Sequence, residues 1–116
     1  MKYLCMVFNE EKMLDAMPRA EFQALVDAHL AYDDVLRDSG HYLVSNALES
    51  VQTATTIRVR HGKISVTDGP FAEAKEQLGG FYLVEARDLN DAIQVAAGMP
   101  SARTGCIEVR PIRELK

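Results

Sequence analysis

The sequence predicts an α+β domain with a ferredoxin-like split βαβ sheet and both helices on one face of that sheet. Three observations lead to this prediction. The chain opens with a near-continuous apolar run at 2–8, two later segments repeat apolar residues at helical spacing, and short strand-like runs surround those segments. The resulting order is strand, helix, several strands, helix, strand.

The first strand and the first helix are the most strongly patterned part of the chain. Residues 2–8 are expected to form a central strand, because apolar side chains on both sides of a strand indicate that both faces are covered. After an acidic loop, a long helix is predicted between Pro18, which suits a first helical turn, and Gly40, which ends it. Its apolar stripe consists of Phe22, Leu25, Val26, His29, Tyr32 and Leu36.

The middle of the chain reads as strands. A second strand is expected at 42–48, and the runs 55–60 and 63–67 flank His61-Gly62, a two-residue hairpin signal. The hairpin therefore ends next to Asp68.

The segment that follows the hairpin combines charged residues with residues that restrict the backbone. Pro70 fixes its own backbone angle, and we expect a short helix at 71–78 that begins near it. Gly79-Gly80 would separate this helix from a strand at 80–86.

The end of the chain repeats the helix-strand pattern. Asp88 is a suitable cap for a second helix that ends at Gly98, with Pro100 beyond it. A last strand is expected at 106–112.

Composition limits the classes of protein that the chain can be. A length of 116 residues, 47% apolar and 26% charged, fits one globular domain over 1–116 with a single core. The net charge of −4 disfavours nucleic acid as a partner, and the absence of a long apolar run disfavours the membrane. Without a signal-peptide pattern, we expect a cytoplasmic protein.

Cysteine usage indicates neither a disulfide framework nor a metal centre. Cys5 and Cys106 lie in apolar strand-like runs and are expected to be small core residues that stay reduced. A structural zinc site needs four ligands, and no spaced Cys/His set is present in the sequence. We therefore predict no metal.

The segment after the hairpin carries a family resemblance. Its charged, amide and glycine positions, together with the terminal run 108–111, resemble the DGPF-domain proteins of the YCII-related family over nearly the whole chain. The residues that carry the resemblance are Asp68, Gly69, Pro70, Phe71, Glu73, Lys75, Glu76, Gln77, Gly79 and Gly80.

This resemblance implies a dimeric α/β barrel, in which two sheets pack face to face. The apolar runs also predict a dimer, because a sheet with helices on one face leaves the apolar side chains of its other face uncovered. A homodimer is therefore expected. DGPF-domain proteins also resemble companions of extracytoplasmic-function sigma factors, which implies a possible regulatory partner.

His29 is the first candidate catalytic residue. It lies on the apolar stripe of the first helix, whereas His41 and His61 follow a helix stop and sit on a hairpin tip. One interpretation is a core histidine with a single hydrogen bond. The other is a neutral acid–base imidazole oriented by a carboxylate, with Asp33 one turn along or Asp68 from elsewhere.

The resemblance gives His29 further weight. The stretch 28–30 is similar to the part of YCII-related proteins that supplies a proposed catalytic histidine. Those relatives tend to carry an aspartate just before a late proline, and this chain has Met99 before Pro100. Asp68 is the candidate replacement for that carboxylate.

Asp68 is the second candidate catalytic residue. It could accept a backbone N–H at a helix start, or it could act as a general base held on a stiff turn, with Lys75 or Glu76 facing the same cavity and binding substrate.

Arg110 and Tyr82 are candidate substrate-binding residues. Arg110 shares a strand face with Glu108, so it could form an edge-strand ion pair, contact a dimer partner or bind a substrate carboxylate or phosphate. Tyr82 could line a pocket or be an ordinary strand aromatic.

Two functions follow from these residues. The first is a cofactor-free enzyme performing acid–base work, such as elimination, isomerisation or hydrolysis, on a small molecule. No glycine-rich phosphate loop, dinucleotide fingerprint or nucleophile elbow is present in the sequence. The alternative is a noncatalytic dimer that binds a small ligand or regulates a sigma-factor system, as the resemblance implies.

Overall fold

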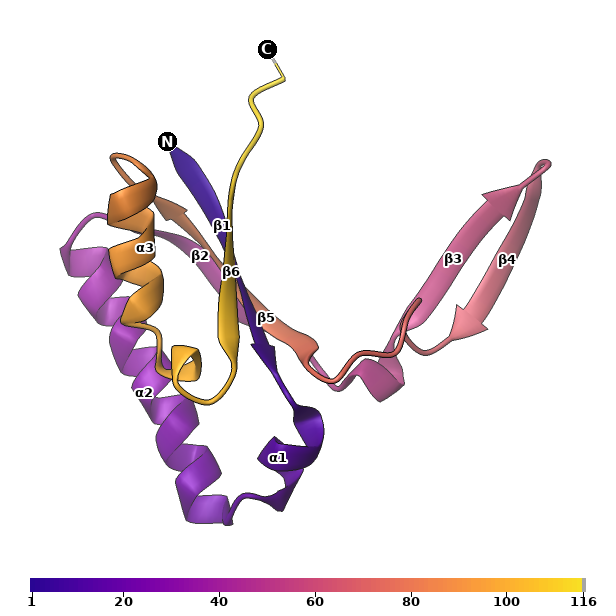
Figure 1. The fold of residues 1–116 in the computed structure, drawn as a ribbon, viewed down its shortest axis with the longest axis horizontal. Coiled ribbons are helices and arrows are strands. Elements are labelled where there is room, and N and C mark those ends of the chain that lie inside the picture. Colours follow the sequence, from indigo (N-terminus) through magenta and orange to yellow (C-terminus); the bar gives the residue numbers. More distant parts are fainter. Residues whose placement is uncertain (116) are drawn as a thin grey trace.

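The structure is a computed structural model that describes residues 1–115, and it contains a four-stranded antiparallel sheet with helices packed on one face (Figure 1). Its elements are β1 (Lys2–Asn9), α1 (Glu11–Ala16), α2 (Arg19–Asp38), β2 (Tyr42–Ala47), η1 (Val51–Thr53), β3 (Thr55–Arg60), β4 (Lys63–Asp68), β5 (Gln77–Glu85), α3 (Leu89–Ala97), η2 (Pro100–Ala102) and β6 (Cys106–Pro111). The strand order β2-β5-β1-β6 is that of a ferredoxin-like split βαβ sheet. The predicted fold class is confirmed.

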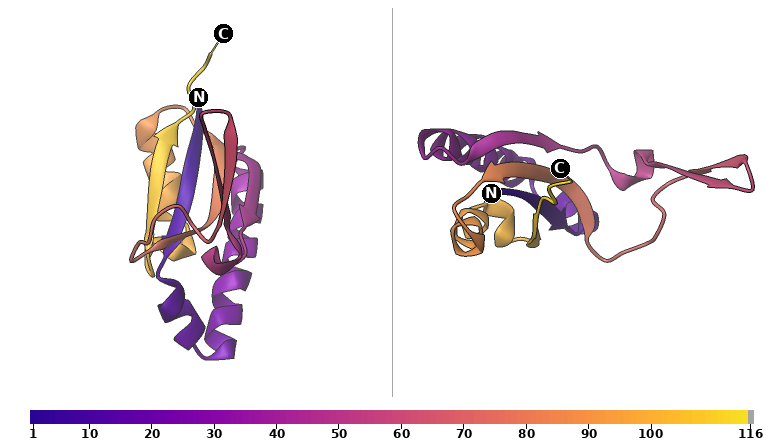
Figure 2. Two further views of the ribbon diagram at one scale, coloured as in Figure 1. Left: turned by 90° about the vertical axis from the view of Figure 1, so that its right-hand side faces the viewer. Right: turned by 90° about the horizontal axis from the view of Figure 1, so that it is seen from above.

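The two long helices cover the same face of the sheet, as two directions of view show (Figures 1 and 2). Alternation along β1 separates the faces: Tyr3, Cys5 and Val7 are buried toward the helices, while Leu4 and Met6 point to the open side and are half-buried. The core therefore lies between the sheet and the helices. It consists of Tyr3, Cys5, Val7, Leu36, Tyr82, Val84, Ala86, Ala92, Val95 and Met99.

The predicted hairpin forms and projects away from the sheet (Figure 1). His61 and Gly62 both have positive φ, as a tight two-residue hairpin turn requires. The arm exposes the apolar side chains Ile57, Val59, Ile64 and Val66, which are cross-strand partners in two pairs.

Two segments differ from the predicted secondary structure. The acidic loop after β1 is the short helix α1, whose sequence EKMLDA consists mostly of good helix formers but is too short to show a period. The helix predicted at 71–78 does not form, and Gln77 and Leu78 instead belong to β5. They pair with Asn9 and Phe8 of β1, so strand pairing overrides the helical pattern.

The glycine pair lies inside β5 rather than before it. Gly80 is buried opposite Ala47, and a Cβ atom there would stand 2.9 Å from the carbonyl oxygen of Asn46. Glycine at this position therefore allows β2 to approach β5 closely.

The second helix begins and ends as predicted. Asp88 Oδ1 accepts a hydrogen bond from the Asp91 amide at 2.9 Å, and Gly98 follows the last helical residue. Tyr32 Oη of α2 donates to the Val95 carbonyl at 2.7 Å, which ties the two helices together.

The two cysteines are free thiols on neighbouring strands, but they point to opposite faces. Cys5 is buried, and this burial raises the pKa of its thiol to about 11. Cys106 is exposed, so the prediction that it is a core residue was wrong. Within residues 1–115, no helix is long and apolar enough to cross a membrane.

Candidate functional site

A cavity of about 360 Å³ lies between α2 and the helix-facing side of β2 and β5; we call it the α2 cavity. Most of its lining is apolar, with Phe22, Leu25 and Val26 contributed by the N-terminal half of α2. Its polar lining residues come from five different elements of the fold or their ends: Asn9, His29, Asp33, Ser45, Asn46, Tyr82 and Ser101. An apolar cavity with a few convergent polar groups is the usual form of a small-molecule site.

His29 is held in the α2 cavity through both ring nitrogens. Its Nδ1 lies 2.7 Å from Tyr82 Oη and its Nε2 lies 2.7 Å from Ser101 Oγ. Asn9 Nδ2 donates to Ser101 Oγ at 3.1 Å, while Asn9 Oδ1 accepts from Thr104 Oγ1 at 2.7 Å. This network leaves the Ser101 hydroxyl proton for His29 Nε2, so the assigned tautomer carries its own proton on Nδ1 and donates it to Tyr82.

Both members of the His29–Tyr82 pair are uncharged. Burial lowers the pKa of His29, and the carboxylate of Asp33 opposes that effect only in part. Burial, and then the charge of Asp33, raises the pKa of Tyr82 well above its usual range. In such a pair the neutral imidazole can accept a proton on Nε2, and the protonated phenol can donate a hydrogen bond to another group.

Asp33 is buried in the wall of the α2 cavity and is only partly hydrogen-bonded. Its Oδ2 accepts from Ser45 Oγ at 3.3 Å, and Ser45 Oγ is also 3.0 Å from Tyr42 Oη. Among residues 1–115, its Oδ1 has no hydrogen-bond partner although it is buried. Buried carboxylate oxygens are seldom left in this state.

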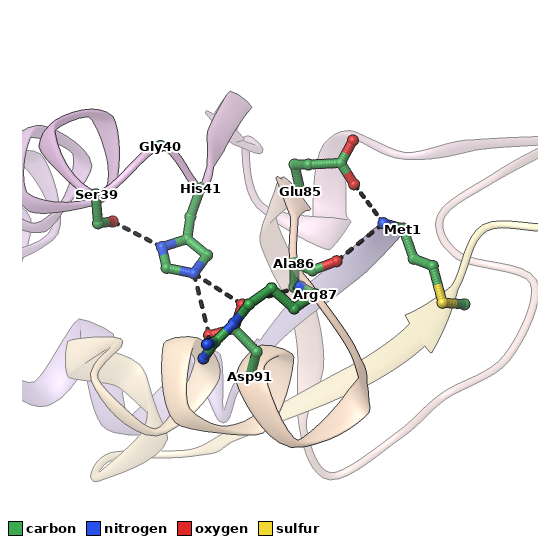
Figure 3. Close-up of a pocket in the computed structure, with 8 residues that line it drawn as sticks. All are labelled: Met1, Ser39, Gly40, His41, Glu85, Ala86, Arg87 and Asp91. Carbon is green, nitrogen blue, oxygen red and sulfur yellow. Dashed lines mark hydrogen bonds and ion pairs between the residues drawn. The ribbon is translucent and has the colours of Figure 1, made fainter.

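A second cavity, of about 380 Å³, lies at the C-terminal end of α2 beside Met1, and we call it the N-terminal cavity (Figure 3). Its central group is His41, whose Nδ1 lies 2.7 Å from Ser39 Oγ and whose Nε2 lies 3.1 Å from Asp91 Oδ2. Arg87 donates to the same carboxylate from its backbone at 3.0 Å and from its guanidinium at 3.4 Å.

Asp91 is ionised in the N-terminal cavity. The backbone N–H of Arg87, followed by the side chains of His41 and Arg87, lowers the pKa of Asp91 to about 2. These contacts join the turn between α2 and β2 to the start of α3. The N-terminal ammonium adds an ion pair with Glu85 at 2.6 Å.

Ser39, His41 and Asp91 have the residue types of a nucleophilic triad, but their placement favours a structural role. Ser39 follows the last residue of α2, and its Oγ also donates to the Leu36 carbonyl at 3.2 Å. The negative end of the helix dipole disfavours an alkoxide at this position. The N-terminal cavity is therefore the weaker candidate for chemistry.

Of the residues predicted for the site, the structure brings His29 and Tyr82 together in the α2 cavity. Asp68 ends β4, pairs with Thr55 and is exposed on the projecting hairpin, away from α2 (Figure 1). A His29–Asp68 dyad therefore does not form within the chain, because the hairpin turns outward from the sheet.

The other predicted substrate-binding residues also lie outside the α2 cavity. Lys75 is exposed in the segment between β4 and β5, and Glu76 Oε1 lies 3.6 Å from Cys106 Sγ. Arg110 pairs with Glu108 at 3.8 Å on the edge strand β6, as the edge-strand alternative expects.

Sequence reasoning missed Ser101 as a partner of His29, and Asn9 as the residue that holds Ser101. In the relatives, a carboxylate tends to stand just before the proline that corresponds to Pro100. The segment around Pro100 does lie next to His29 in this structure. Met99, however, is fully buried in the core, and Ser101 supplies the contact. Within residues 1–115, no three His, Cys, Asp or Glu side chains gather in a way that could hold a metal ion.

Comparison with known proteins identifies relatives over the whole chain. The model of the YCII-related domain matches residues 1–116. An uncharacterised protein of Rhizobium meliloti (strain 1021) is 33% identical over 114 residues, which cover 97% of this chain and 92% of that protein.

A solved structure has a similar fold. It is 5-chloro-2-hydroxyhydroquinone dehydrochlorinase from Burkholderia phenoliruptrix AC1100 in complex with 2,5-dihydroxybenzoquinone. The TM-score is 0.55 and the identity 18%, with 97% of this chain and 94% of that chain covered.

Proposed function

Because the chain belongs to the YCII-related family, we propose that its α2 cavity is the active site of a cofactor-free enzyme that performs acid–base chemistry on a small organic molecule. We also place the chain in the DGPF subgroup, on the motif Asp68–Phe71. The observation that carries the proposal is His29, a neutral imidazole held through both nitrogens in an apolar cavity.

The geometry gives each residue a role. Ser101 lines the cavity with its Oγ 2.7 Å from His29 Nε2, so its hydroxyl can take a proton from the substrate while it passes its own proton to the ring. Tyr82 accepts from His29 Nδ1–H, which leaves its own hydroxyl proton to bind an oxygen that becomes negative during the reaction. Asn9 holds Ser101 and is a positioning residue.

The reaction class draws support from the structural neighbour. That protein is named as a dehydrochlorinase and was solved with a dihydroxybenzoquinone. Elimination and isomerisation of small ring compounds need a base and a hydrogen-bond donor to oxygen, which are the two functions proposed for His29 and Tyr82.

The test is a turnover screen of substituted hydroquinones and quinones, with 5-chloro-2-hydroxyhydroquinone included. For a substrate found in this way, His29→Gln should lower kcat by about 10²- to 10⁴-fold, the usual contribution of a general acid–base residue. His61→Gln, at the exposed hairpin tip, is the control and should change nothing. Full activity of the folded His29→Gln protein would refute the proposal.

A noncatalytic small-ligand-binding module is the second candidate, and the mostly apolar lining of the α2 cavity favours it. Tight binding of a compound from the screen with no turnover at any pH would support this alternative over catalysis. The sigma-factor association that the resemblance implies finds no support in these comparisons.

We also propose that the protein is a homodimer that covers the open face of its sheet. Leu4, Met6, Phe81 and Leu83 on that face are only half-buried in one chain. Leu83→Lys should convert the dimer to a monomer in sedimentation velocity, because a charge in an apolar interface is costly. Ile64→Lys on the hairpin arm is the matched control, and a wild-type monomer at micromolar concentration would contradict the proposal.

A further inference from the structure

We infer that Asp33 is a group that binds the substrate, and that the α2 cavity accepts a small uncharged ring compound whose hydroxyl group donates a hydrogen bond to the Asp33 carboxylate. This inference rests on the proposed function of the cavity and adds the class of substrate. It excludes anionic substrates, such as free carboxylates and phosphate esters.

Asp33 is buried, and its hydrogen bonding is incomplete. It is 8% exposed and lines the α2 cavity, and no donor lies within hydrogen-bond geometry of its Oδ1 among residues 1–115. The Tyr82 hydroxyl lies near the carboxylate, and its interaction with Asp33 contributes to the raised pKa of Tyr82. The other oxygen is occupied by Ser45, which is held in turn by Tyr42. A buried acceptor without a donor destabilises the free protein, and a ligand that brings a donor removes that penalty.

The α2 cavity carries one acidic side chain, that of Asp33, and neither Lys nor Arg among its described lining residues. Arg110 and Lys75, which the sequence suggested for an acidic substrate, lie elsewhere. An anion would meet a carboxylate with no compensating cation, whereas a neutral hydroxyl would find a strong acceptor.

The size of the α2 cavity and the spacing between Asp33 and His29 suit a single ring. Asp33 and His29 are four residues apart on α2, so their Cβ atoms are neighbours at about 5–6 Å on one helix face. A single ring can therefore place a hydroxyl on Asp33 and a second substituent near His29 and Tyr82. The volume of about 360 Å³ is at the small end of the range for ligand pockets.

The experiment measures binding rather than turnover, so that its outcome is separate from that of the proposed function. Hydroquinone, 1,4-dimethoxybenzene and 4-hydroxybenzoate are titrated into the wild-type protein by calorimetry. Hydroquinone should bind at least about tenfold more tightly than the dimethyl ether, which lacks a donor, as expected for a hydrogen bond to a charged acceptor. The benzoate should bind more weakly than hydroquinone.

Variants of Asp33 test whether this side chain causes the preference for hydroquinone over its dimethyl ether. Asp33→Leu should abolish the preference for hydroquinone over its dimethyl ether, and the isosteric Asp33→Asn should reduce it. Asp34→Asn is the matched control, because Asp34 is the next residue on the same helix and its side chain is 77% exposed. Equal binding of the diol and the ether by wild-type protein, or an unchanged preference in Asp33→Leu, would overturn the inference.

Stability separates a binding role from a structural one. Asp33→Leu removes a buried oxygen without a partner together with the 3.3 Å hydrogen bond from Ser45, so the melting temperature of the free variant should stay unchanged or rise. A lower melting temperature in both Asp33 variants would mark Asp33 as structural and overturn the inference. His29→Gln should keep the preference for hydroquinone. If it does and the wild-type protein turns over no compound of the screen, Asp33 recognition stands and the catalytic proposal fails.

Discussion

His29 and His41 belong to the same chain and have opposite surroundings. His29 lies in an apolar cavity between two neutral hydroxyl groups, and burial lowers its pKa. His41 lies at the C-terminal end of α2 and contacts a carboxylate that is itself held by an arginine. Both imidazoles have two hydrogen-bond partners, so the number of contacts does not distinguish them.

The difference lies in the charge of the partners. Neutral partners leave a buried imidazole free to gain and lose a proton within the reaction. The contacts of His41 with Ser39 and with the ionised Asp91 carboxylate hold its ring in place between α2 and α3. The α2 cavity therefore suits chemistry, and the N-terminal cavity suits the joining of α2, β2 and α3.

The largest effect is expected from Asp91→Asn, which removes the charge at the centre of the N-terminal cavity. The melting temperature at pH 7 should fall by several degrees, because His41 and Arg87 lose their shared partner. Differential scanning calorimetry measures this loss, and Asp34→Asn at an exposed position is the control.

The same variant should change the acid sensitivity of the protein. Because the pKa of Asp91 falls from 3.8 to about 2 on folding, its stabilising contribution is present above pH 3.8 and is lost as the pH falls toward 2. Asp91→Asn should flatten the dependence of stability on pH in this window. An unchanged slope there would mean that Asp91 is not the carboxylate that the fold depends on.

A second, intermediate effect is expected from Ser101→Asp, which gives His29 the kind of partner that His41 has. A carboxylate at hydrogen-bond distance should raise the pKa of His29 by about 1–3 units, measured by NMR titration of the ring. Turnover near neutral pH should then fall, because the base is protonated. Ser101→Asn is the neutral control, and an unchanged pKa of His29 in a folded Ser101→Asp protein would contradict the assigned contact.

The smallest effect concerns the pH dependence of stability that His29 itself contributes. Its pKa is lower in the folded protein than the value of 6.5 for the free side chain, so stability should decrease as the pH falls below 6.5. Urea unfolding of wild type and His29→Gln at pH 7 and pH 5 measures the difference. The wild type should lose more stability than the variant, and equal losses would indicate that His29 titrates normally.

Much of the fold could be predicted from local patterns. Four local signals each correspond to an element that formed: the apolar run of β1, the helical stripe of α2, the Asp88 cap and the His61-Gly62 turn. The segment 71–78 shows the limit of such signals. Its residues favour a short helix, but Gln77 and Leu78 pair with β1 from far along the chain.

The site was predictable only in part. Helical spacing places His29 on the core-facing stripe of α2 and Asp33 one turn along. The partners Tyr82 and Ser101 are 53 and 72 residues away in sequence, and no local pattern connects them to His29. Asp68 shows the reverse case, because this residue of a distinctive motif ends a hairpin that turns away from α2 (Figure 1).

The amino-acid sequence alone determined the strands, the two long helices and the histidine that faces the sheet, because periodicity and caps act between near neighbours. The tertiary structure decided which polar groups meet that histidine and which carboxylate oxygen stays without a donor. Those outcomes depend on the packing of η2, β5 and α2 against one another. Hydrogen bonds across such distances form only once the sheet order is set.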